Sequence, residues 1–238
     1  PGGCAIGSRP INFHLDALKK MGAKIKIKSG YVVARAKKGL KGSNIRFPEI
    51  SVGATENILL AACFSKGKTK LSNCAIEPEI QDLVIFLKKL GCEIKWTGRR
   101  NLEIEGIKKI KSATHKIIFD RIEAGTYMIA ALLTNGKVKI KNINLNIMSV
   151  VIKLLKSMGS KILKRKNYVV VSGSKNLKSS IVKTNPYPGF PTDLQAQLMV
   201  LMTKAKGISK IKESIFENRF MHVSELRRMG AQINVKGN

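Results

Sequence analysis

The chain has 238 residues, of which 44% are hydrophobic, and its 44 basic and 15 acidic residues give a formal net charge of +29. This hydrophobic fraction excludes intrinsic disorder, and the length allows one large domain or two modest ones. No apolar run approaches the roughly 18 residues that span a bilayer, and no signal-peptide pattern is present. The chain does not begin with Met, and we interpret it as an internal piece of a longer protein.

The positive charge is compatible with a nucleic-acid binder, but its distribution argues against one. Lysines occur along the whole chain, in stretches such as KKMGAKIKIK and SKILKRK, and mostly flank predicted strands and turns. The sequence contains no helix-turn-helix pattern and no aromatic-interleaved RNA-binding signature. We therefore do not expect nucleic acid as the principal partner.

The first segment, PGGCAIGSRP, places Cys4 behind two glycines and five residues before Arg9. Glycines let the backbone move and approach a ligand closely, and a nearby guanidinium stabilises a thiolate. The segment alone leaves two interpretations open: a reactive cysteine, or a passive thiol in a terminal loop.

The other three cysteines, Cys63, Cys74 and Cys92, form no CxxC pair and lie far in sequence from the three histidines. A zinc site is therefore not expected. Cys63 and Cys92 stand in apolar surroundings and are predicted to be small core residues. Scattered free thiols are typical of a reducing compartment, which predicts a cytoplasmic protein.

Two sequence elements repeat along the chain in a fixed phase. A predicted helix that ends in Leu-Gly or Met-Gly, followed by a short alternating strand, occurs four times at spacings of 69, 68 and 71 residues. The four glycines are Gly22, Gly91, Gly159 and Gly230. A helix end at a Lys-Gly or Asn-Gly turn, followed by a strand, precedes three of them by 24, 23 and 23 residues. The glycines of this second element are Gly67, Gly136 and Gly207.

Each repeat translates into the order strand-helix-strand-helix-strand-strand. Left-handed glycines are expected to end the helices. Alternation in KTKLSN, KVKIKN and AQINV predicts strands, and segments such as AKIKIKSGYVVARA predict hairpins. Because such a unit leaves both of its helices with apolar faces, copies must pack together with the helices inside. The predicted fold class is α/β, built from repeated βαβαββ units.

Six stretches carry a resemblance to a known family: PGGCAIGSRP, SVGATENILLAA, EPEIQDL, DRIEAGTY, FPTDLQAQ and FENRFMH. In this order, and over essentially the whole chain, they resemble the UDP-N-acetylglucosamine enolpyruvyl transferases (1-carboxyvinyltransferases). The resemblance implies the enolpyruvyl transferase fold, with two domains that are each an inside-out α/β barrel. It assigns residues 1–115 to the later part of the catalytic-loop domain and residues 116–238 to the earlier part of the second barrel. Both domains would be incomplete in this chain.

The resemblance also implies a reaction, with no cofactor and no metal. The enolpyruvyl group of phosphoenolpyruvate is transferred to the 3′-hydroxyl of UDP-N-acetylglucosamine, and phosphate is released. In the family, the cysteine of the mobile PGGC loop donates the proton, can form a thioether with phosphoenolpyruvate and is alkylated by fosfomycin; Cys4 matches it. Arg9 matches the phosphate-binding arginine, and Asp193 matches the aspartate that accepts the hydroxyl proton.

The resemblance places the sugar nucleotide at two loops and two further positions. Three residues depart from the family pattern: Asn12 stands where an acid is common, Phe13 where Leu is common, and Glu49 where Lys often stands. Free N–H groups at a strand-to-helix turn suit a diphosphate. The implied substrate-binding residues are Arg9, Pro10, Ile11, Asn12, Phe13, Glu49, Ile50, Ser51, Val52, Gly53, Asp193 and Ile215.

Asp193 also has a structural interpretation, as an N-cap of the helix predicted in LQAQLMVLMTKA. Arg219 and Glu217 are expected to form a structural ion pair. In DRIEAGTY, Asp120 and Glu123 are expected to cap the following helix or to hold the connection between domains, and we assign them no catalytic role.

Two other functions stay open. One is the related transferase that acts on shikimate 3-phosphate, which PGGC and the whole-chain resemblance disfavour. The other is an inactive basic binding protein that keeps the fold, which the joint presence of Cys4, Arg9 and Asp193 disfavours. We expect two small anionic substrates, a role in cell-wall biogenesis, cell shape and division, and no membrane partner. The isolated fragment is expected to lack activity.

Overall fold

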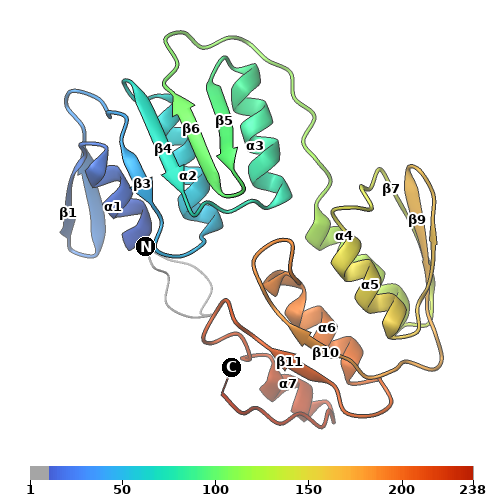
Figure 1. Ribbon diagram of the computed structural model, residues 1–238. Helices are drawn as coiled ribbons and strands as arrows, with labels where there is room; N and C mark the ends of the chain where they lie inside the picture. Colours follow the sequence, from blue (N-terminus) through green and yellow to red (C-terminus); the bar gives the residue numbers. More distant parts are fainter. Residues whose placement is uncertain (1–10, 238) are drawn as a thin grey trace. The chain divides into compact units, whose positions relative to one another are not determined.

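The computed structural model describes residues 11–237, and Figure 1 shows their course. These residues form two compact units, residues 11–118 and residues 119–237. Cys4, Arg9 and Pro10 lie outside the described residues. Among residues 11–237, no helix is long and apolar enough to cross a membrane.

The first unit contains one complete repeat in the predicted order. Its elements are β3 (Asn44–Arg46), α2 (Val52–Cys63), β4 (Lys68–Ser72), α3 (Pro78–Lys89), β5 (Glu93–Gly98) and β6 (Asn101–Glu105). The end of an earlier repeat precedes it and consists of α1 (Asn12–Lys20), β1 (Lys24–Lys28) and β2 (Tyr31–Arg35). The βαβαββ order is therefore confirmed.

The second unit contains parts of two further repeats. The first of these comprises α4 (Arg121–Leu133), β7 (Lys137–Lys141), α5 (Ser149–Ser157), β8 (Lys161–Lys164) and β9 (Tyr168–Ser172). The next comprises β10 (Ile181–Lys183), a 3₁₀ turn (Thr192–Leu194), α6 (Gln195–Met202), β11 (Lys210–Lys212) and α7 (Val223–Arg228). The strand predicted in AQINV is wrong, since residues 231–237 contain none. Alternation makes a strand only where a partner takes up its backbone hydrogen bonds, and no described strand pairs with this segment.

The complete repeat forms a four-stranded sheet in the order β3-β4-β6-β5. β3 runs parallel to β4, while β4 and β5 both pair antiparallel with β6. Leu71 lies opposite Leu102, and both side chains are buried. On the other face, Glu103 pairs with Lys68 at 2.9 Å and with Lys70 at 3.9 Å. The alternation read from KTKLSN thus separates a core face from a charged face.

The repeated Leu-Gly and Met-Gly glycines end their helices as predicted. Gly22, Gly91, Gly159 and Gly230 have φ values of 96°, 103°, 108° and 94°. At the first of them, the Gly22 N–H donates to the Lys19 carbonyl (2.9 Å) and the Ala23 N–H to the Leu18 carbonyl (3.0 Å). This pair of bonds is the Schellman motif, and it recurs at the other three glycines.

The glycines of the second repeated element, Gly67, Gly136 and Gly207, do not cap helices as predicted. Gly67 and Gly207 are left-handed, but they lie beyond the helix caps, in the turns that lead to β4 and β11. At the middle position Asn135 takes the left-handed conformation instead of Gly136, with φ of 52°. Asparagine tolerates this conformation because its short side chain can bond locally. The role predicted for these three glycines as helix caps is therefore wrong.

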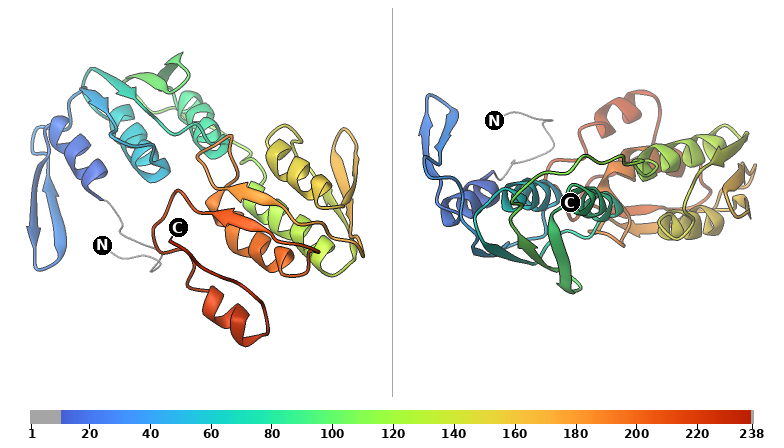
Figure 2. Two further views of the ribbon diagram at one scale, coloured as in Figure 1. Left: turned by 60° about the horizontal axis from the view of Figure 1, so that its bottom comes forward. Right: turned by 90° about the horizontal axis from the view of Figure 1, so that it is seen from above.

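Within each unit, helices of successive repeats pack against each other. α1 packs on α2 in the first unit, and α4 packs on α6 in the second, where they lie side by side (Figures 1 and 2). Cys63 and Cys92 are buried in the core of the first unit, as predicted. Gly125 of α4 faces the next repeat so closely that a Cβ there would lie 2.4 Å from Leu194 Cδ1.

We expect Gly22→Ala to destabilise the protein. Nothing lies within 4 Å of a Cβ at this position, so the cost is the left-handed backbone alone, about 1–2 kcal/mol. Gly53→Ala is the matched control, because Gly53 lies in α2 with no left-handed φ and alanine favours a helix. Urea denaturation followed by circular dichroism measures both. Equal midpoints for Gly22→Ala and wild type would contradict the cap assignment.

Candidate active site

The first predicted nucleotide segment forms the start of a helix rather than a loop. Ile11 is the N-cap of α1, and its carbonyl accepts from the N–H groups of His14 and Leu15, both at 3.0 Å. Asn12 and Phe13 occupy the first turn, so the loop predicted there is corrected. The physical reason is packing, since Phe13 contacts the core of the unit. Their N–H groups belong to the set that has no intrahelical partner.

The second predicted segment is the strand-to-helix turn that the sequence indicated. Ser51 is the N-cap of α2, and its hydroxyl accepts from the Ala54 N–H at 3.2 Å. Thr55 fixes the turn by donating to the Ser51 carbonyl (2.8 Å) and accepting from the Ala75 N–H (3.0 Å). This leaves the N–H groups of Val52 and Gly53 at the open end of the helix. Ile50, just before the turn, is half-buried, and Glu49 is exposed.

The packing of α1 on α2 brings these two helix starts together. The Asn57 amide lies 2.9 Å from Nδ1 of His14, which joins the second turn of α2 to the first turn of α1. A Cβ on Gly53 would lie 3.6 Å from Cε1 of the same imidazole. The positive ends of two helix dipoles thus lie side by side, and such an arrangement favours an anion.

His14 links the two helices in its neutral form. An amide NH₂ only donates, so Nδ1 must accept and the proton lies on Nε2. Burial lowers the pKa of His14 below its ordinary value. The imidazole is therefore a neutral spacer between the helix starts, and it adds no charge of its own at neutral pH.

The second unit places Asp193 beside a guanidinium. Asp193 lies in the 3₁₀ turn before α6, and its carboxylate accepts from Nη2 of Arg219 at 2.7 Å. The Arg219 side chain is 18% exposed and that of Asp193 is 58% exposed. The N-cap interpretation of Asp193 is wrong, because Leu194 is the N-cap of α6, Pro191 is that of the 3₁₀ turn, and no side chain caps either element. The ion pair expected between Arg219 and Glu217 is also wrong, since Asp193 is the partner.

Ile215 lies close in sequence to this pair and has its backbone N–H engaged. That N–H donates to Oε1 of Glu213 at 2.8 Å, and the side chain is exposed. Its carbonyl oxygen is the group left for a ligand. Arg219 also lies over the Phe216 ring, with Cζ 5.3 Å from the ring centroid. The segment after β11 therefore carries both Ile215, the predicted nucleotide contact, and the Arg219 guanidinium.

Other singled-out residues have structural positions. Asp120 caps α4 by accepting from the N–H groups of Ile122 (2.7 Å) and Glu123 (3.0 Å), as expected. His115 lies 3.0 Å from Asp82 in a buried pair. Among residues 11–237, no group of three or more His, Cys, Asp or Glu side chains could hold a metal ion.

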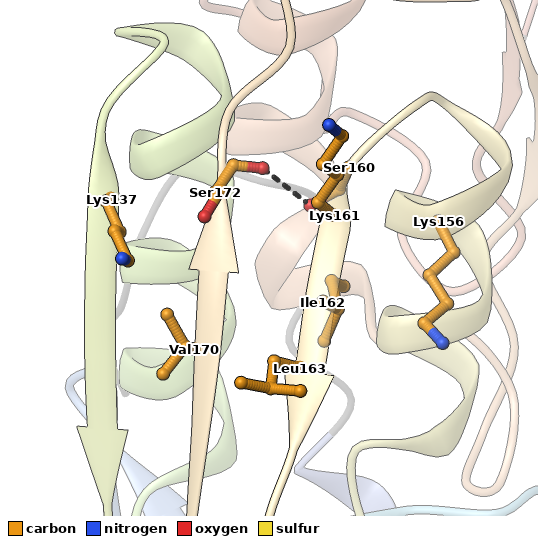
Figure 3. A pocket seen from close by; sticks show the side chains of 8 residues that line it. All are labelled: Lys137, Lys156, Ser160, Lys161, Ile162, Leu163, Val170 and Ser172. Carbon is orange, nitrogen blue, oxygen red and sulfur yellow. Dashed lines mark hydrogen bonds between the residues drawn. The ribbon is translucent and has the colours of Figure 1, made fainter.

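A cavity of about 660 Å³ opens on the sheet β7-β9-β8 of the second unit (Figure 3). Lys137 and Lys161 stand at the starts of two of its strands, and Lys156 comes from α5. Of the predicted site residues that the structure describes, none lines this cavity. The cavity therefore shares no residue with the two clusters described above.

Sequence reasoning missed His14 and Glu213, and it gave Arg219 the wrong partner. His14 and Arg219 each act through a partner that is distant in sequence, and single residues give no signal of such pairing. His14 and Asn57 are 43 residues apart, and Arg219 and Asp193 are 26 apart. The only sequence signal for a site role was the position of the two residues. His14 directly follows the predicted nucleotide segment, and Arg219 lies in FENRF, one of the stretches that carry the family resemblance.

Comparison with known proteins matches the whole chain to one family. The profile of the EPSP synthase (3-phosphoshikimate 1-carboxyvinyltransferase) family matches residues 1–238. The UDP-N-acetylglucosamine 1-carboxyvinyltransferase of Pelagibacter ubique (strain HTCC1062) is 60% identical over 238 residues, and that of Endomicrobium trichonymphae is 53% identical over 237. All of this chain is covered in both comparisons, and it spans 57% of the length of each relative.

Among solved structures, the enolpyruvyl transferase NikO from Streptomyces tendae superposes with a TM-score of 0.83 at 22% identity. The match covers 97% of this chain and 57% of the NikO chain. The EPSP synthase from Acinetobacter baumannii gives a TM-score of 0.59 at 21% identity, over 88% of this chain and 50% of its own. At these identities the likeness shows the fold, and the predicted enolpyruvyl transferase fold is confirmed.

We expect the link through His14 to weaken in acid. Because the folded-state pKa of His14 is lowered, the unfolded chain binds more protons as the pH falls below about 6.5, and the stability that the neutral imidazole contributes is lost. Full stability returns above that pH. The Tm difference between wild type and His14→Gln, which cannot titrate, should shrink from about pH 7.5 to about pH 5.5. A difference that is independent of pH would contradict this assignment.

Proposed function

Because the chain belongs to the EPSP synthase family of carboxyvinyltransferases, we propose that the complete protein transfers the enolpyruvyl group of phosphoenolpyruvate to UDP-N-acetylglucosamine. The 3′-hydroxyl oxygen of the sugar bonds to C2 of phosphoenolpyruvate, and phosphate leaves from that carbon. Relatives that carry this activity in their names are 48–60% identical. The solved EPSP synthases are 21% identical. The sugar nucleotide is therefore favoured over shikimate 3-phosphate.

The observation that carries the choice of a nucleotide is the pairing of two helix starts in the first unit. Residues 11–13 and 51–53 are far apart in sequence, yet the contact between Asn57 and His14 holds them together. Backbone N–H groups at both starts can donate to a diphosphate, and neither start needs a basic side chain to do so. This arrangement tolerates the departures at Asn12 and Glu49, because the donors belong to the backbone.

In the proposed reaction, two side chains move protons. Cys4 protonates the methylene carbon of phosphoenolpyruvate, and Asp193 accepts the proton of the sugar hydroxyl. When phosphate leaves, the methyl group formed in this way loses a proton again, which restores the vinyl group in the product. Arg9 binds the phosphate that leaves, for which a guanidinium offers a bidentate fit. The geometry of Asp193 supports its role, since its carboxylate is exposed to a substrate while one oxygen is held by Arg219 at 2.7 Å.

We propose the corresponding cellular role as well: the first committed step of peptidoglycan synthesis, in the cytoplasm, with consequences for cell shape and division. The buried cysteines of the first unit support a reducing compartment, because Cys63, Cys74 and Cys92 are free thiols, and the Cys92 thiol donates a hydrogen bond to Cys63 Sγ at 2.8 Å instead of forming a disulfide. Burial raises the pKa of Cys74 to about 12, so this thiol stays protonated and unreactive.

The reaction is tested by phosphate release from phosphoenolpyruvate by the full-length protein, with and without UDP-N-acetylglucosamine. We expect release to require the sugar nucleotide and to fall by about 100-fold or more in Cys4→Ala and Asp193→Ala, because each removes a group that transfers a proton. Shikimate 3-phosphate should not replace the sugar nucleotide. Glu123→Ala is the matched control for a carboxylate outside the site, with unchanged release expected. Sugar-independent release, or none from the folded protein, would overturn the proposal.

Fosfomycin should modify one cysteine of the four. Its epoxide is opened by a thiolate, so alkylation requires an accessible, deprotonated thiol. We expect the intact mass of the full-length protein to rise by one fosfomycin molecule, with the label on Cys4 after proteolysis. Cys4→Ala should stay unlabelled, while Cys74→Ala, which removes a buried thiol, should label like wild type. Labelling of Cys63, Cys74 or Cys92 would refute the assignment of Cys4.

A further inference from the structure

Glu213, directly after β11, is a buried carboxylate in a strongly basic protein. Its residue is 1% exposed, and among residues 11–237 no basic side chain pairs with it. A buried charge without hydrogen-bond partners is strongly unfavourable. The donors around it are therefore the reason that this side chain can be buried here.

Four donors from three chain segments surround this carboxylate. Oε1 accepts from the Thr184 hydroxyl (2.9 Å) and from the N–H groups of Ile215 (2.8 Å) and Phe216 (3.2 Å). Oε2 accepts from the Thr192 hydroxyl (3.0 Å). Four donors match the acceptor capacity of an ionised carboxylate.

The segments that Glu213 joins carry the candidate groups of the second unit. Thr192 directly precedes Asp193 in the 3₁₀ turn. Ile215 is the predicted nucleotide contact, and Phe216 lies beneath the Arg219 guanidinium. Thr184 closes the network by accepting from the Ser214 N–H at 2.9 Å. One side chain thus bonds to the hydroxyl of the residue before Asp193 and to two backbone N–H groups shortly before Arg219.

We propose that Glu213 is the positioning residue of this half of the site. Through its bond to Thr192 it fixes the position of the Asp193 carboxylate. Through its bonds to the Ile215 and Phe216 amides it fixes the position of the nucleotide contact at Ile215 and of the Arg219 guanidinium. The effect of Glu213 on the reaction rests on the proposed function. The inference goes beyond that function because Glu213 itself is buried and touches no substrate. A misplacement of about 1 Å in a reacting group can lower a rate by about 100-fold.

The two arms of the network predict different kinetic effects. Thr192→Val removes the arm that leads to Asp193, so kcat should fall by about 10-fold or more while KM for UDP-N-acetylglucosamine changes by less than about 2-fold. Glu213→Ala removes both arms, so kcat should fall and this KM should rise. Glu213→Gln should restore most of the activity, because its amide oxygen can take the three bonds at Oε1 and its NH₂ can donate to the Thr192 hydroxyl.

Thr203→Val is the matched control, because this hydroxyl bonds to the Val200 carbonyl within the same unit and outside the network. Its kcat and KM should equal those of wild type. If Thr192→Val leaves kcat unchanged, or if Glu213→Gln is as poor as Glu213→Ala at equal Tm, the positioning role is overturned.

Amide hydrogen exchange separates this inference from the proposed function. In the full-length protein, the amides of Ile215 and Phe216 should exchange faster in Glu213→Ala than in wild type, while those of α4 keep their rates. Unchanged protection of both amides would overturn the inference whatever the activity. A wild type that turns over no sugar nucleotide would refute the proposed function, and the exchange rates would still decide whether Glu213 holds these segments.

Discussion

Each repeat of this protein presents an apolar helix face that the helix of a neighbouring repeat covers. In the first unit, Ala17 and Met21 at the end of α1 belong to the same core as Ile58 and Ala62 of α2. In the second, α4 approaches the next repeat so closely that a Cβ at position 125 would lie 2.4 Å from Leu194 Cδ1 and the leucine side chain would have to shift. Packing between repeats is thus the constraint from which the rest of the structure follows.

The candidate site is a consequence of that packing. When α1 packs on α2, the first turns of both helices lie together, and two nucleotide segments that are distant in sequence become neighbours through His14 and Asn57. When α4 packs on the turn before α6, Leu194 is buried and the adjacent Asp193 is left at the surface. Residues that stabilise the core therefore also place the residues proposed to act on substrate.

The second unit uses two carboxylates in opposite ways. Glu213 is buried and bonded by four donors, none of them a cation. Asp193 is more than half exposed and is held by one guanidinium. A fully bonded buried group is rigid and unavailable to a ligand, whereas an exposed group with free lone pairs can accept a proton. Burial and partners, rather than residue type, separate the structural role from the proposed chemical one.

The sequence by itself determined the local structure of this protein: the βαβαββ order, the left-handed glycines at positions 22, 91, 159 and 230, and the turn at Ser51. These depend on backbone preferences and on periodicity, which are local properties of the chain. Only the tertiary structure decided that Asn12 and Phe13 are helical, that Asn135 replaces Gly136 as the left-handed residue, that residues 231–237 form no strand, and that Asp193 pairs with Arg219. Each of these depends on a partner many residues away or on competition between neighbours, and the free energy of such a contact is set by packing that no local pattern encodes.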